Sequence, residues 1–294
     1  MRKILVRSFG GPEVLELVEA DRPTPGPGQV LVEVRAIGVN PADWKLRAGW
    51  VPKYGTPPFT PGLDFSGVTG AGHEVYGVAF PTVGSYAEYI AVSVDALAPK
   101  PTSVDFEHAA ALPTAALTAY QPLVDVQPGQ RVLVHGAAGG VGHLAVQILK
   151  ARGAYVLGTA RAGKHPFLRD LGLDEPIDYT TADFSELRDI DVVLDTVGYG
   201  PKALAGIKPG GHLIDVVGSG TDRSDVIAAA AERDVRFEQF GFRPSGGDLA
   251  DIAKLVDSGQ VRVAVEQVLP LAAAAEAHEL SESGRVRGKL VLTP

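Results

Sequence analysis

The segment HGAAGGVGHLAVQ, residues 135–147, limits the fold more than any other part of this chain, because it contains four glycines and three alanines. A short apolar run, residues 131–134, precedes it, and residues 141–150 place apolar side chains at helical spacing. A strand, a glycine turn and a helix in this order are typical of a βα unit that binds a dinucleotide. The missing side chains let backbone N–H groups approach a pyrophosphate at the positive end of the helix dipole. The alternative is a tight turn that binds nothing.

The spacing Ala137-x-Gly139-x-x-Gly142 fits the dinucleotide pattern, with alanine in place of the first glycine. Gly142 is expected to permit close packing of the helix on the strand. The predicted cofactor loop consists of Ala137, Ala138, Gly139, Gly140, Val141 and Gly142.

The pattern of apolar runs, prolines and glycines changes twice along the chain. Residues 1–104 contain short β-like runs broken by proline and glycine, which predict an all-β module. Over residues 105–260, apolar runs alternate with helix-like segments, which predicts βαβ units and a parallel sheet buried on both faces. Residues 261–294 are expected to rejoin the first module. The predicted fold is therefore α/β, with a Rossmann doubly wound parallel sheet and a separate β domain.

The residues after the second strand of the Rossmann unit indicate which dinucleotide binds. An NAD site usually has an acidic residue there, which bonds the ribose hydroxyls. Here the run YVLGTA is followed by Arg161 and then Lys164, and the first acid is Asp170. A guanidinium binds a 2′-phosphate through a charge-assisted pair. The pattern predicts NADPH as cofactor, with two solvated charges at a helix start as the alternative.

Composition excludes several classes of function. Among the 294 residues there is no cysteine, which excludes a disulfide framework, a thiolate zinc site and a cysteine nucleophile. The formal net charge of −8 argues against general affinity for nucleic acid or an anionic membrane. No run approaches the roughly 18 consecutive apolar residues of a membrane span, and the first residues do not read as a signal peptide. We expect a cytoplasmic protein that binds small molecules.

Several motifs, in collinear order over nearly the whole chain, resemble one family. They are GVNPADWKLRAG, PGLDFSG, GSYAEYIAV, LPTAALTAYQPL, GAAGGVGHLAVQ and GKLVLTP. They resemble the zinc-independent quinone oxidoreductase branch of the medium-chain dehydrogenase/reductase superfamily. The resemblance implies a GroES-like β domain, residues 1–104, which the segment 261–294 completes around an inserted Rossmann NADP-binding domain, residues 105–260. It also implies a cleft between the two domains, and a homodimer.

The same comparison indicates that no metal is bound. The zinc alcohol dehydrogenases have a cysteine and a histidine as ligands where this sequence has Asn40 and Leu63. The seven histidines are scattered, and no two lie at a ligand spacing of two or four residues. Without a Lewis acid, alcohol oxidation loses the group that stabilises a developing alkoxide. Quinones and activated enones accept a hydride without that help, since the charge spreads to a remote oxygen.

Family positions suggest further site residues. Asn40, Lys45 and Tyr54 are candidates for contact with the carbonyl oxygen of the substrate, with an ordinary surface lysine as the alternative for Lys45. Asp43 is expected to hold Lys45 or a backbone amide, and Asp64 to be either a cleft acid or a structural residue. Further cofactor contacts are expected from Thr118, Tyr179, Val217 and Gly218.

The sequence therefore predicts an NADPH-dependent, zinc-free oxidoreductase that reduces quinones or α,β-unsaturated carbonyls by hydride transfer. Two alternatives remain: an enoyl-thioester reductase, and a non-catalytic NADPH-binding sensor or structural protein. One departure from the family pattern weakens the transfer of substrate preference. The segment between DFSG and EVYG is reduced to VTGAGH, so we expect two strands to be shortened into one tight turn.

Overall fold

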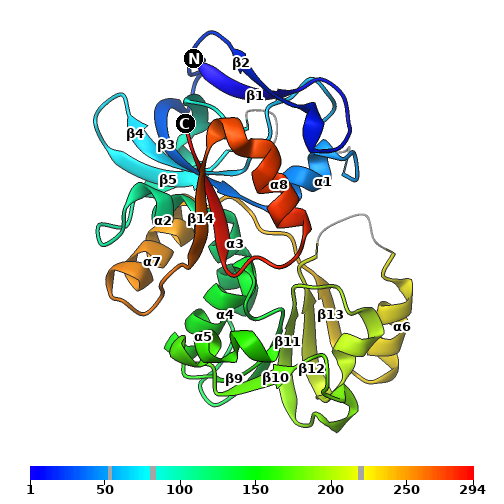
Figure 1. Cartoon of the computed structure of the whole chain (residues 1–294). Helices are drawn as coiled ribbons and strands as arrows, with labels where there is room; N and C mark the ends of the chain where they lie inside the picture. The colour runs from blue at the N-terminus through cyan, green and yellow to red at the C-terminus, as the bar shows by residue number, and fades with distance from the viewer. Residues whose placement is uncertain (52–54, 80–83, 218–221) are drawn as a thin grey trace. The chain divides into compact units, whose positions relative to one another are not determined.

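The structure is a computed structural model that describes residues 1–51, 55–79, 84–217 and 222–294. The chain divides into two compact units. The first unit is made of Met1–Leu117, Arg243–Gly259 and Val263–Pro294, and the second of Thr118–Phe242 and Gln260–Arg262. Figure 1 draws the second unit in green and yellow.

A mixed sheet forms the framework of the first unit, in the order β14-β15-β3-β4-β5-β7, with β6 paired to β3. Its strands are β3 (Gln29–Val39), β4 (Asp64–Thr69), β5 (Glu74–Val78), β6 (Tyr89–Ser93), β7 (Leu97–Pro99), β14 (Val265–Pro270) and β15 (Lys289–Thr293). A second, two-stranded sheet pairs β1 (Arg2–Val6) with β2 (Leu15–Glu19). Strand β15 runs antiparallel to β3, so the C-terminal residues complete the β domain.

Strands β4 and β5 form a hairpin across the shortened segment. Val68 pairs with Glu74, and the turn is closed by bonds from Thr69 N to His73 O (2.9 Å) and from Gly72 N to Thr69 O (2.8 Å). Gly72 has a positive φ of 85°, which side chains other than glycine rarely adopt. Two adjacent strands and a tight turn therefore replace the longer family segment.

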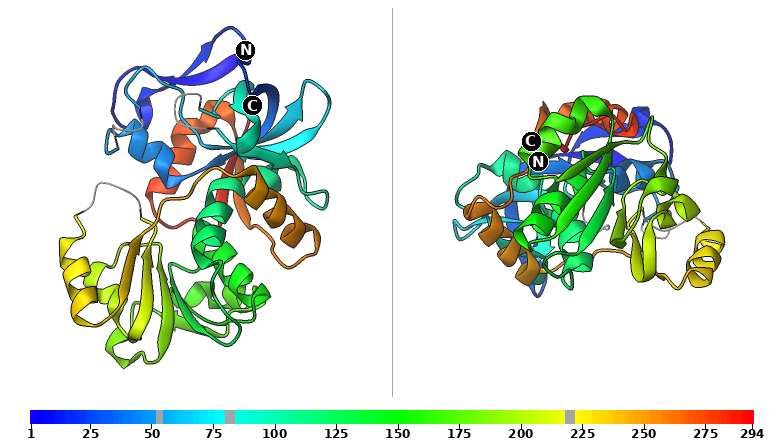
Figure 2. Two further views of the ribbon diagram at one scale, coloured as in Figure 1. Left: turned by 180° about the vertical axis from the view of Figure 1, so that it is seen from behind. Right: turned by 90° about the horizontal axis from the view of Figure 1, so that it is seen from below.

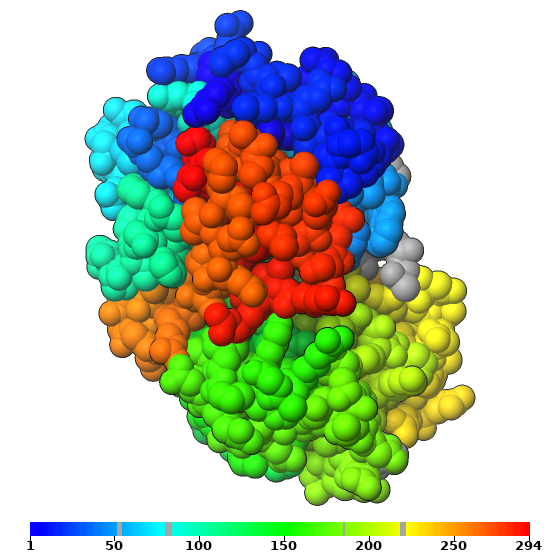
Figure 3. All heavy atoms as spheres, viewed as in Figure 1, coloured from blue at the N-terminus to red at the C-terminus, as the bar shows by residue number. Residues whose placement is uncertain are grey.

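The helices of the first unit pack on its sheets and on one another. They are η1 (Pro12–Val14), α1 (Pro41–Arg47), η3 (Val94–Ala96), α2 (Phe106–Ala110), α7 (Gly246–Asp257), η8 (Leu271–Ala273) and α8 (Ala274–Glu282). Helix α3 (Pro113–Tyr120) begins in this unit and ends in the second. In Figure 3 the C-terminal residues, in orange and red, lie on the same face of this unit as the N-terminal residues in blue, and α8 packs against η1.

Two helices lie outside the predicted boundaries of their domain. Helices α2 and α7 fall within 105–260, yet both belong to the first unit. Ser66 on β4 donates a hydrogen bond to Phe106 O (2.6 Å), and the Tyr76 hydroxyl on β5 donates to Leu249 O. These long-range bonds hold both helices against the β domain, which the local sequence pattern does not show.

The second unit is a six-stranded, fully parallel sheet in the order β10-β9-β8-β11-β12-β13 (Figure 2). Its strands are β8 (Arg131–His135), β9 (Tyr155–Ala160), β10 (Glu175–Asp178), β11 (Ile190–Asp195), β12 (Ile207–Asp215) and β13 (Arg236–Gln239). Its helices are η4 (Gln121–Leu123), α4 (Gly140–Ala151), η5 (Ala162–Lys164), α5 (His165–Asp170), η6 (Phe184–Glu186), η7 (Gly200–Leu204) and α6 (Ser224–Glu232). The predicted Rossmann fold is confirmed.

The strand order places a topological switch point between β8 and β11. The chain proceeds from β8 to β9 and β10 on one side, and then returns to β11 on the other side of β8. Ligands of doubly wound sheets bind outside the carboxyl ends of the strands at such a point. Here those ends are His135 and Asp195, which pair in register. The glycine loop begins one residue after His135.

Candidate functional site

The glycine loop joins β8 to α4 at the switch point. Gly136 has a positive φ of 69°, and a Cβ on it would lie 2.5 Å from Thr196 Oγ1 in the loop after β11. A Cβ on Gly142 would lie 2.3 Å from Gly136 O, so this residue permits the helix to pack closely on the turn. Gly139 is the N-cap of α4, and no side chain caps that helix end. A Cβ on Gly139 would meet only Gly136 O, at 3.3 Å.

This geometry fits a pyrophosphate. The first N–H groups of a helix have no intrahelical acceptor, and they carry the positive end of its dipole. In α4 no side-chain oxygen takes their place, and the absence of a side chain at Gly139 leaves room beside them. An anion is the group that such a helix end binds.

The residues after β9 and β10 offer a second anion site in the same unit. The Arg161 Nε donates to the Tyr179 hydroxyl at 2.9 Å, and both side chains are exposed. Lys164 is half-buried at the end of η5. The adjacent acid, Asp178, accepts bonds from Thr180 N (3.0 Å) and Thr180 Oγ1 (2.7 Å), which lower its pKa. Asp178 Oδ2 also accepts a bond from Ala162 N at 3.3 Å, so the carboxylate is held between its own turn and the loop that follows β9.

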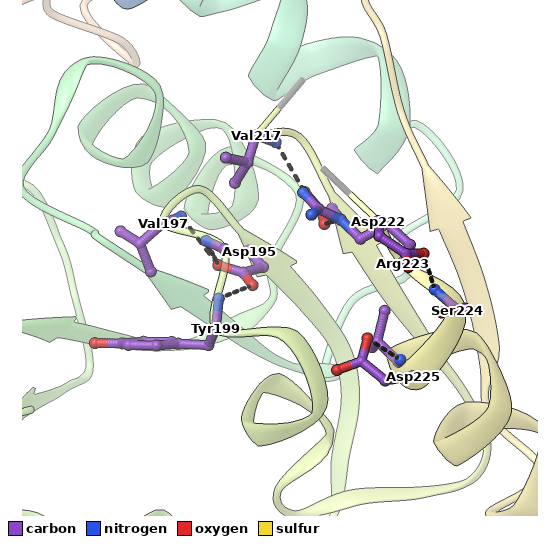
Figure 4. A network of polar contacts seen from close by, with 11 residues as sticks. Asp195, Val197, Tyr199, Val217, Asp222, Arg223, Ser224 and Asp225 are labelled. Atoms are coloured by element: carbon purple, nitrogen blue, oxygen red, sulfur yellow. Dashed lines mark hydrogen bonds and ion pairs between the residues drawn. The ribbon is translucent and has the colours of Figure 1, made fainter. Parts of the chain in front are cut away.

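Carboxylates shape the loops that follow β11 and β12 (Figure 4). Asp195 accepts bonds from the backbone N–H groups of Val197 (2.9 Å), Gly198 (2.9 Å) and Tyr199 (2.8 Å). Asp215 pairs with the buried Arg223 and accepts a bond from Val217 N at 2.8 Å. The Val217 N–H is therefore engaged within the protein, and it is not available to a cofactor carboxamide in this conformation.

The remaining predicted cofactor residues are placed as follows. Thr118 lies on α3 and is buried. Gly218 lies outside the described residues, as does the predicted substrate residue Tyr54. The second unit thus brings together the loop 137–142, and separately Arg161 with Tyr179.

The first unit contains a buried polar cluster that the sequence analysis only partly anticipated. It comprises Asn40, Asp43, Arg47, Asp64, Tyr86, Thr114, His278 and Lys289. The Asn40 Nδ2 donates to Asp64 Oδ2 at 2.9 Å, and Lys289 Nζ donates to Asn40 Oδ1. The Lys289 Nζ also lies 3.5 Å from Asp64 Oδ2, and Asp64 Oδ1 accepts from Thr114 N at 2.8 Å. Both ends of the Asn40 amide therefore engage buried charged partners.

Asp43 holds a backbone amide, which is one of the two roles expected for it from the sequence. Its Oδ2 accepts a bond from Asn40 N at 2.8 Å, which closes a capping box at the start of α1. The Tyr86 hydroxyl lies 3.2 Å from the same oxygen and donates to it. Asp43 thus holds a backbone amide. Asp64, fully buried, holds Asn40 and Thr114 in place.

The cluster continues to the surface through His278. Arginine only donates, so His278 Nδ1, 3.4 Å from Arg47 Nη1, is the acceptor of that contact. Burial and the nearby Arg47 lower the pKa of His278 to about 3, so the ring is neutral and carries its proton on Nε2. That nitrogen lies 3.1 Å from the Tyr86 oxygen and donates to it. Arg47 Nη2 in turn donates to Glu282 Oε1 at 2.7 Å.

Lys45 lies one helical turn beyond the N-cap of α1. Its Nζ is 5.7 Å from the centre of the Trp44 ring, and the side chain is half-buried. Burial lowers the pKa of Lys45, which makes its ammonium a stronger acid. Lys45 and Asn40 are thus on one short helix, and only the Asn40 side chain is part of the buried cluster.

Neither a metal centre nor a membrane span is evident in the described residues. Among them, no group of three or more histidine, aspartate or glutamate side chains is arranged to hold a metal ion. Burial lowers the pKa of His135 to about 4, so this histidine is neutral in the core of the sheet. No helix in the described ranges is both long enough and apolar enough to cross a bilayer.

Comparison with known proteins identifies the family. Residues 26–79 match the alcohol dehydrogenase GroES-like domain, and residues 171–292 match the family described as zinc-binding dehydrogenase. The chain is 34% identical over 313 residues to 2-methylene-furan-3-one reductase of Solanum lycopersicum, which covers 97% of this chain and 77% of the relative. It resembles the structure of the quinone oxidoreductase from Coxiella burnetii with a TM-score of 0.93 and 36% identity, over 100% of this chain and 99% of that one. The chain belongs to the quinone and enone oxidoreductases of the medium-chain dehydrogenase/reductase superfamily.

The nicotinamide cofactor named for related proteins of known structure differs from one to the next. The Escherichia coli quinone oxidoreductase complexed with NADPH is 28% identical, with a TM-score of 0.90 over 100% of both chains. The structure of an NAD-dependent alcohol dehydrogenase is 34% identical, with a TM-score of 0.91 over 100% of both chains. Membership of the family thus establishes an oxidoreductase that uses a nicotinamide cofactor, while the phosphate preference depends on this chain's own residues.

The buried cluster of this oxidoreductase makes its stability depend on pH. Burial raises the pKa of Asp43 from 3.8 to about 7; Asp64 raises it further, and Lys289 and the bonds from Asn40 and Tyr86 oppose the rise. The folded chain therefore binds more protons than the unfolded chain between those two values. We expect this contribution to stability to be fully present below the unfolded pKa. It should then fall by about 1.4 kcal/mol per pH unit and be lost above the folded pKa.

The variant Asp43→Asn isolates this effect, because it retains an oxygen acceptor for Asn40 N and has no charge to titrate. Urea unfolding at a series of pH values from about 5 to about 8 should give a shallower loss of stability in the variant than in the wild type. Both tryptophans lie in the first unit, so their fluorescence follows its unfolding. Equal pH slopes for the two proteins would contradict the assignment to Asp43.

Proposed function

We propose that this protein reduces quinones or α,β-unsaturated carbonyls by NADPH-dependent hydride transfer, without zinc. The observation that carries the proposal is the arrangement at the end of β9. Arg161 and Lys164 occupy the place where an NAD site has an acid, and Tyr179 orients the Arg161 guanidinium through a 2.9 Å bond. A cationic site here favours a 2′-phosphate and gives no preference to an unmodified ribose.

The residues that would hold NADPH are those of the glycine loop and the ends of β9 and β10. The N–H groups at the start of α4 would bind the pyrophosphate, and Gly136 and Gly142 maintain the close turn that presents them. Thr118, Val217 and Gly218 remain proposed contacts for the nicotinamide end. For Val217 the contact would come from its carbonyl group, because its N–H is bonded to Asp215.

When bound, the reduced nicotinamide supplies a hydride. A quinone that gains a hydride and one proton becomes a hydroquinone; an enone that gains a hydride at its β-carbon and a proton at its α-carbon becomes a saturated carbonyl. The protein must therefore stabilise negative charge on the acceptor oxygen and supply one proton. Lys45 suits both tasks, because burial lowers its pKa and its ammonium donates hydrogen bonds.

Asn40 and Tyr54 complete the proposed acceptor site. Asn40 makes one firm donor bond, to Asp64, and a long one of 3.5 Å to Gly38 O. The second amide hydrogen, which makes the long bond to Gly38 O, would donate to the carbonyl oxygen of the substrate instead. Lys289 and Asp64 keep the amide oriented. The positions that hold zinc ligands in alcohol dehydrogenases are Asn40 and Leu63, neither of which is a metal ligand of the usual zinc type.

Steady-state oxidation of NADPH by the purified protein, measured against a quinone and an acyclic enone, tests the function. We expect turnover with at least one of these acceptors, and undiminished activity after dialysis against a chelator. Tight NADPH binding without turnover on any acceptor would contradict an enzyme and favour a sensor. Preference for an enoyl thioester would favour the alternative reductase. Light scattering would test the proposed homodimer, and cell fractionation would test the proposed cytoplasmic location.

A further inference from the structure

An exposed aromatic surface lies beside the C-terminal end of α1. We define the aromatic ledge as Phe9, Trp44 and Trp50. Trp50 is 65% exposed, the largest value among the exposed large hydrophobic side chains in the described ranges. The turn that precedes it requires glycine: Gly49 has a positive φ of 77°, and a Cβ there would lie 3.0 Å from Phe9 Cγ.

The ledge is held in place although its outer face is open. The Trp44 and Trp50 rings form an edge-to-face contact, with centroids 5.1 Å apart and an interplanar angle of 77°. Trp50 N donates to Lys45 O at 2.9 Å, so the backbone is fixed as well. Because the Trp50 indole is already ordered, a flat ligand that stacks on it loses little additional side-chain entropy.

A hydrogen-bond donor lies against the same ledge. The Lys45 Nζ is 5.7 Å from the centre of the Trp44 ring. Lys45 and Trp50 therefore both lie beside the Trp44 indole. Trp44 Nε1 is buried and has no hydrogen-bond acceptor in the described structure. The buried Trp44 Nε1 is closed to a ligand on the exposed face, so the ledge combines an electron-rich aromatic surface with one donor group, the Lys45 ammonium.

We propose that the aromatic ledge binds the ring system of a fused-ring quinone, stacked on Trp50 with a carbonyl oxygen toward the Lys45 ammonium. A quinone ring is flat and electron-poor, and its carbonyl oxygens accept hydrogen bonds. An acyclic enone offers the same oxygen but has no ring to stack. This inference rests on the proposed function and deepens it, because it makes Trp50 a specificity-determining residue for quinones over acyclic enones.

The first test compares two acceptors on one variant. Trp50→Ala should lower kcat/KM for a 1,4-naphthoquinone by about tenfold, mainly through KM, and change kcat/KM for an acyclic enone by less than about twofold. Trp50→Phe, which retains a ring, should recover part of the loss. Val94→Ala, which truncates an apolar side chain of the same unit that is 50% exposed, is the matched control and should change neither value. Equal losses on both acceptors would overturn the proposal.

The second test needs no turnover. The chain has two tryptophans, and quinones quench indole fluorescence on contact. In Trp44→Phe, which retains Trp50, naphthoquinone should quench saturably with an unchanged fluorescence lifetime, as a bound complex requires. In Trp50→Ala, which has no ring at this position and retains Trp44 as the fluorophore, the saturable component should disappear. Quenching that is purely collisional in Trp44→Phe, or equally saturable in Trp50→Ala, would overturn the proposal.

The two tests separate this inference from the proposed function. If no acceptor is turned over but saturable quenching depends on Trp50, the ledge binds quinones and the proposed reductase function fails. If quinones are turned over and Trp50→Ala is without effect on them, the function stands and the ledge is not its binding site.

Discussion

Replacing Lys289 with methionine should lower the free energy of unfolding of the first unit by about 3–5 kcal/mol. The Lys289 side chain is 4% exposed, and its ammonium contacts Asn40 Oδ1 and the fully buried Asp64 carboxylate. Methionine fills a similar volume but leaves Asp64 without a counter-charge and Asn40 without a donor. Removing one partner of a buried ion pair is costly for this reason, even where the intact pair contributes little. Urea unfolding followed by tryptophan fluorescence measures the change.

A surface pair of the same chemistry provides the control. Lys254 Nζ lies 2.7 Å from Asp251 Oδ1 on α7, and both side chains are well exposed. Lys254→Met should change stability by less than about 0.5 kcal/mol, since water screens such pairs. The double variant Lys289→Met with Asp64→Asn removes both buried charges, and it should lose less than the sum of the two single losses. Similar effects of Lys289→Met and Lys254→Met would show that burial of the pair carries no special cost.

The sequence was sufficient for those parts of the fold that depend on local pattern. Apolar runs that alternate with helix-like segments predict the parallel sheet, and the glycine spacing predicts the turn before α4. Both signals are local. A strand that is buried on both faces needs a few consecutive apolar residues, and a helix start that is open to an anion needs a few consecutive small ones.

The buried polar cluster could not be predicted in the same way. Lys289 and Asn40 are 249 residues apart in the chain, and His278 and Tyr86 are 192 apart. No periodicity joins such positions, and a lysine at the start of an apolar strand or a lone histidine on a helix reads as an ordinary surface or core residue. One weak signal was present, because Asp64 is an acid at the start of a strand that is otherwise apolar or small.

The sequence also does not predict the backbone hydrogen bonds in the loops after β11 and β12. Val217 follows the end of the parallel strand β12, as the sequence pattern indicates, but the sequence does not show that Asp215 accepts its N–H. Asp195 has the same arrangement one strand away, with three backbone donors. Both aspartates end their strands and organise the loop that follows, so a carboxylate at this position is bound by its own chain before any ligand arrives.

Arg161→Asp should weaken NADPH binding by about 100-fold while NADH binding changes by less than about threefold. The guanidinium that would pair with the 2′-phosphate is replaced by a carboxylate that repels it, whereas NADH has no phosphate at that position. The new carboxylate would also supply the acidic residue that bonds the ribose hydroxyls in NAD sites. Titration of each cofactor into the purified variant, by calorimetry or by fluorescence of the reduced nicotinamide, gives both affinities directly.

Two further variants distinguish a specific contact from a general effect of charge. Arg169→Asp, on the exposed side of α5, changes the net charge by the same amount and should affect both cofactors equally and weakly. Tyr179→Phe keeps the Arg161 charge but removes the hydroxyl that accepts from its Nε, so it should reduce NADPH affinity by only a few fold. If Arg161→Asp weakened NADPH and NADH equally, its role would lie in the fold of the loop. If it weakened neither, phosphate recognition would have to come from another residue near the end of β9, for which Lys164 is the next candidate.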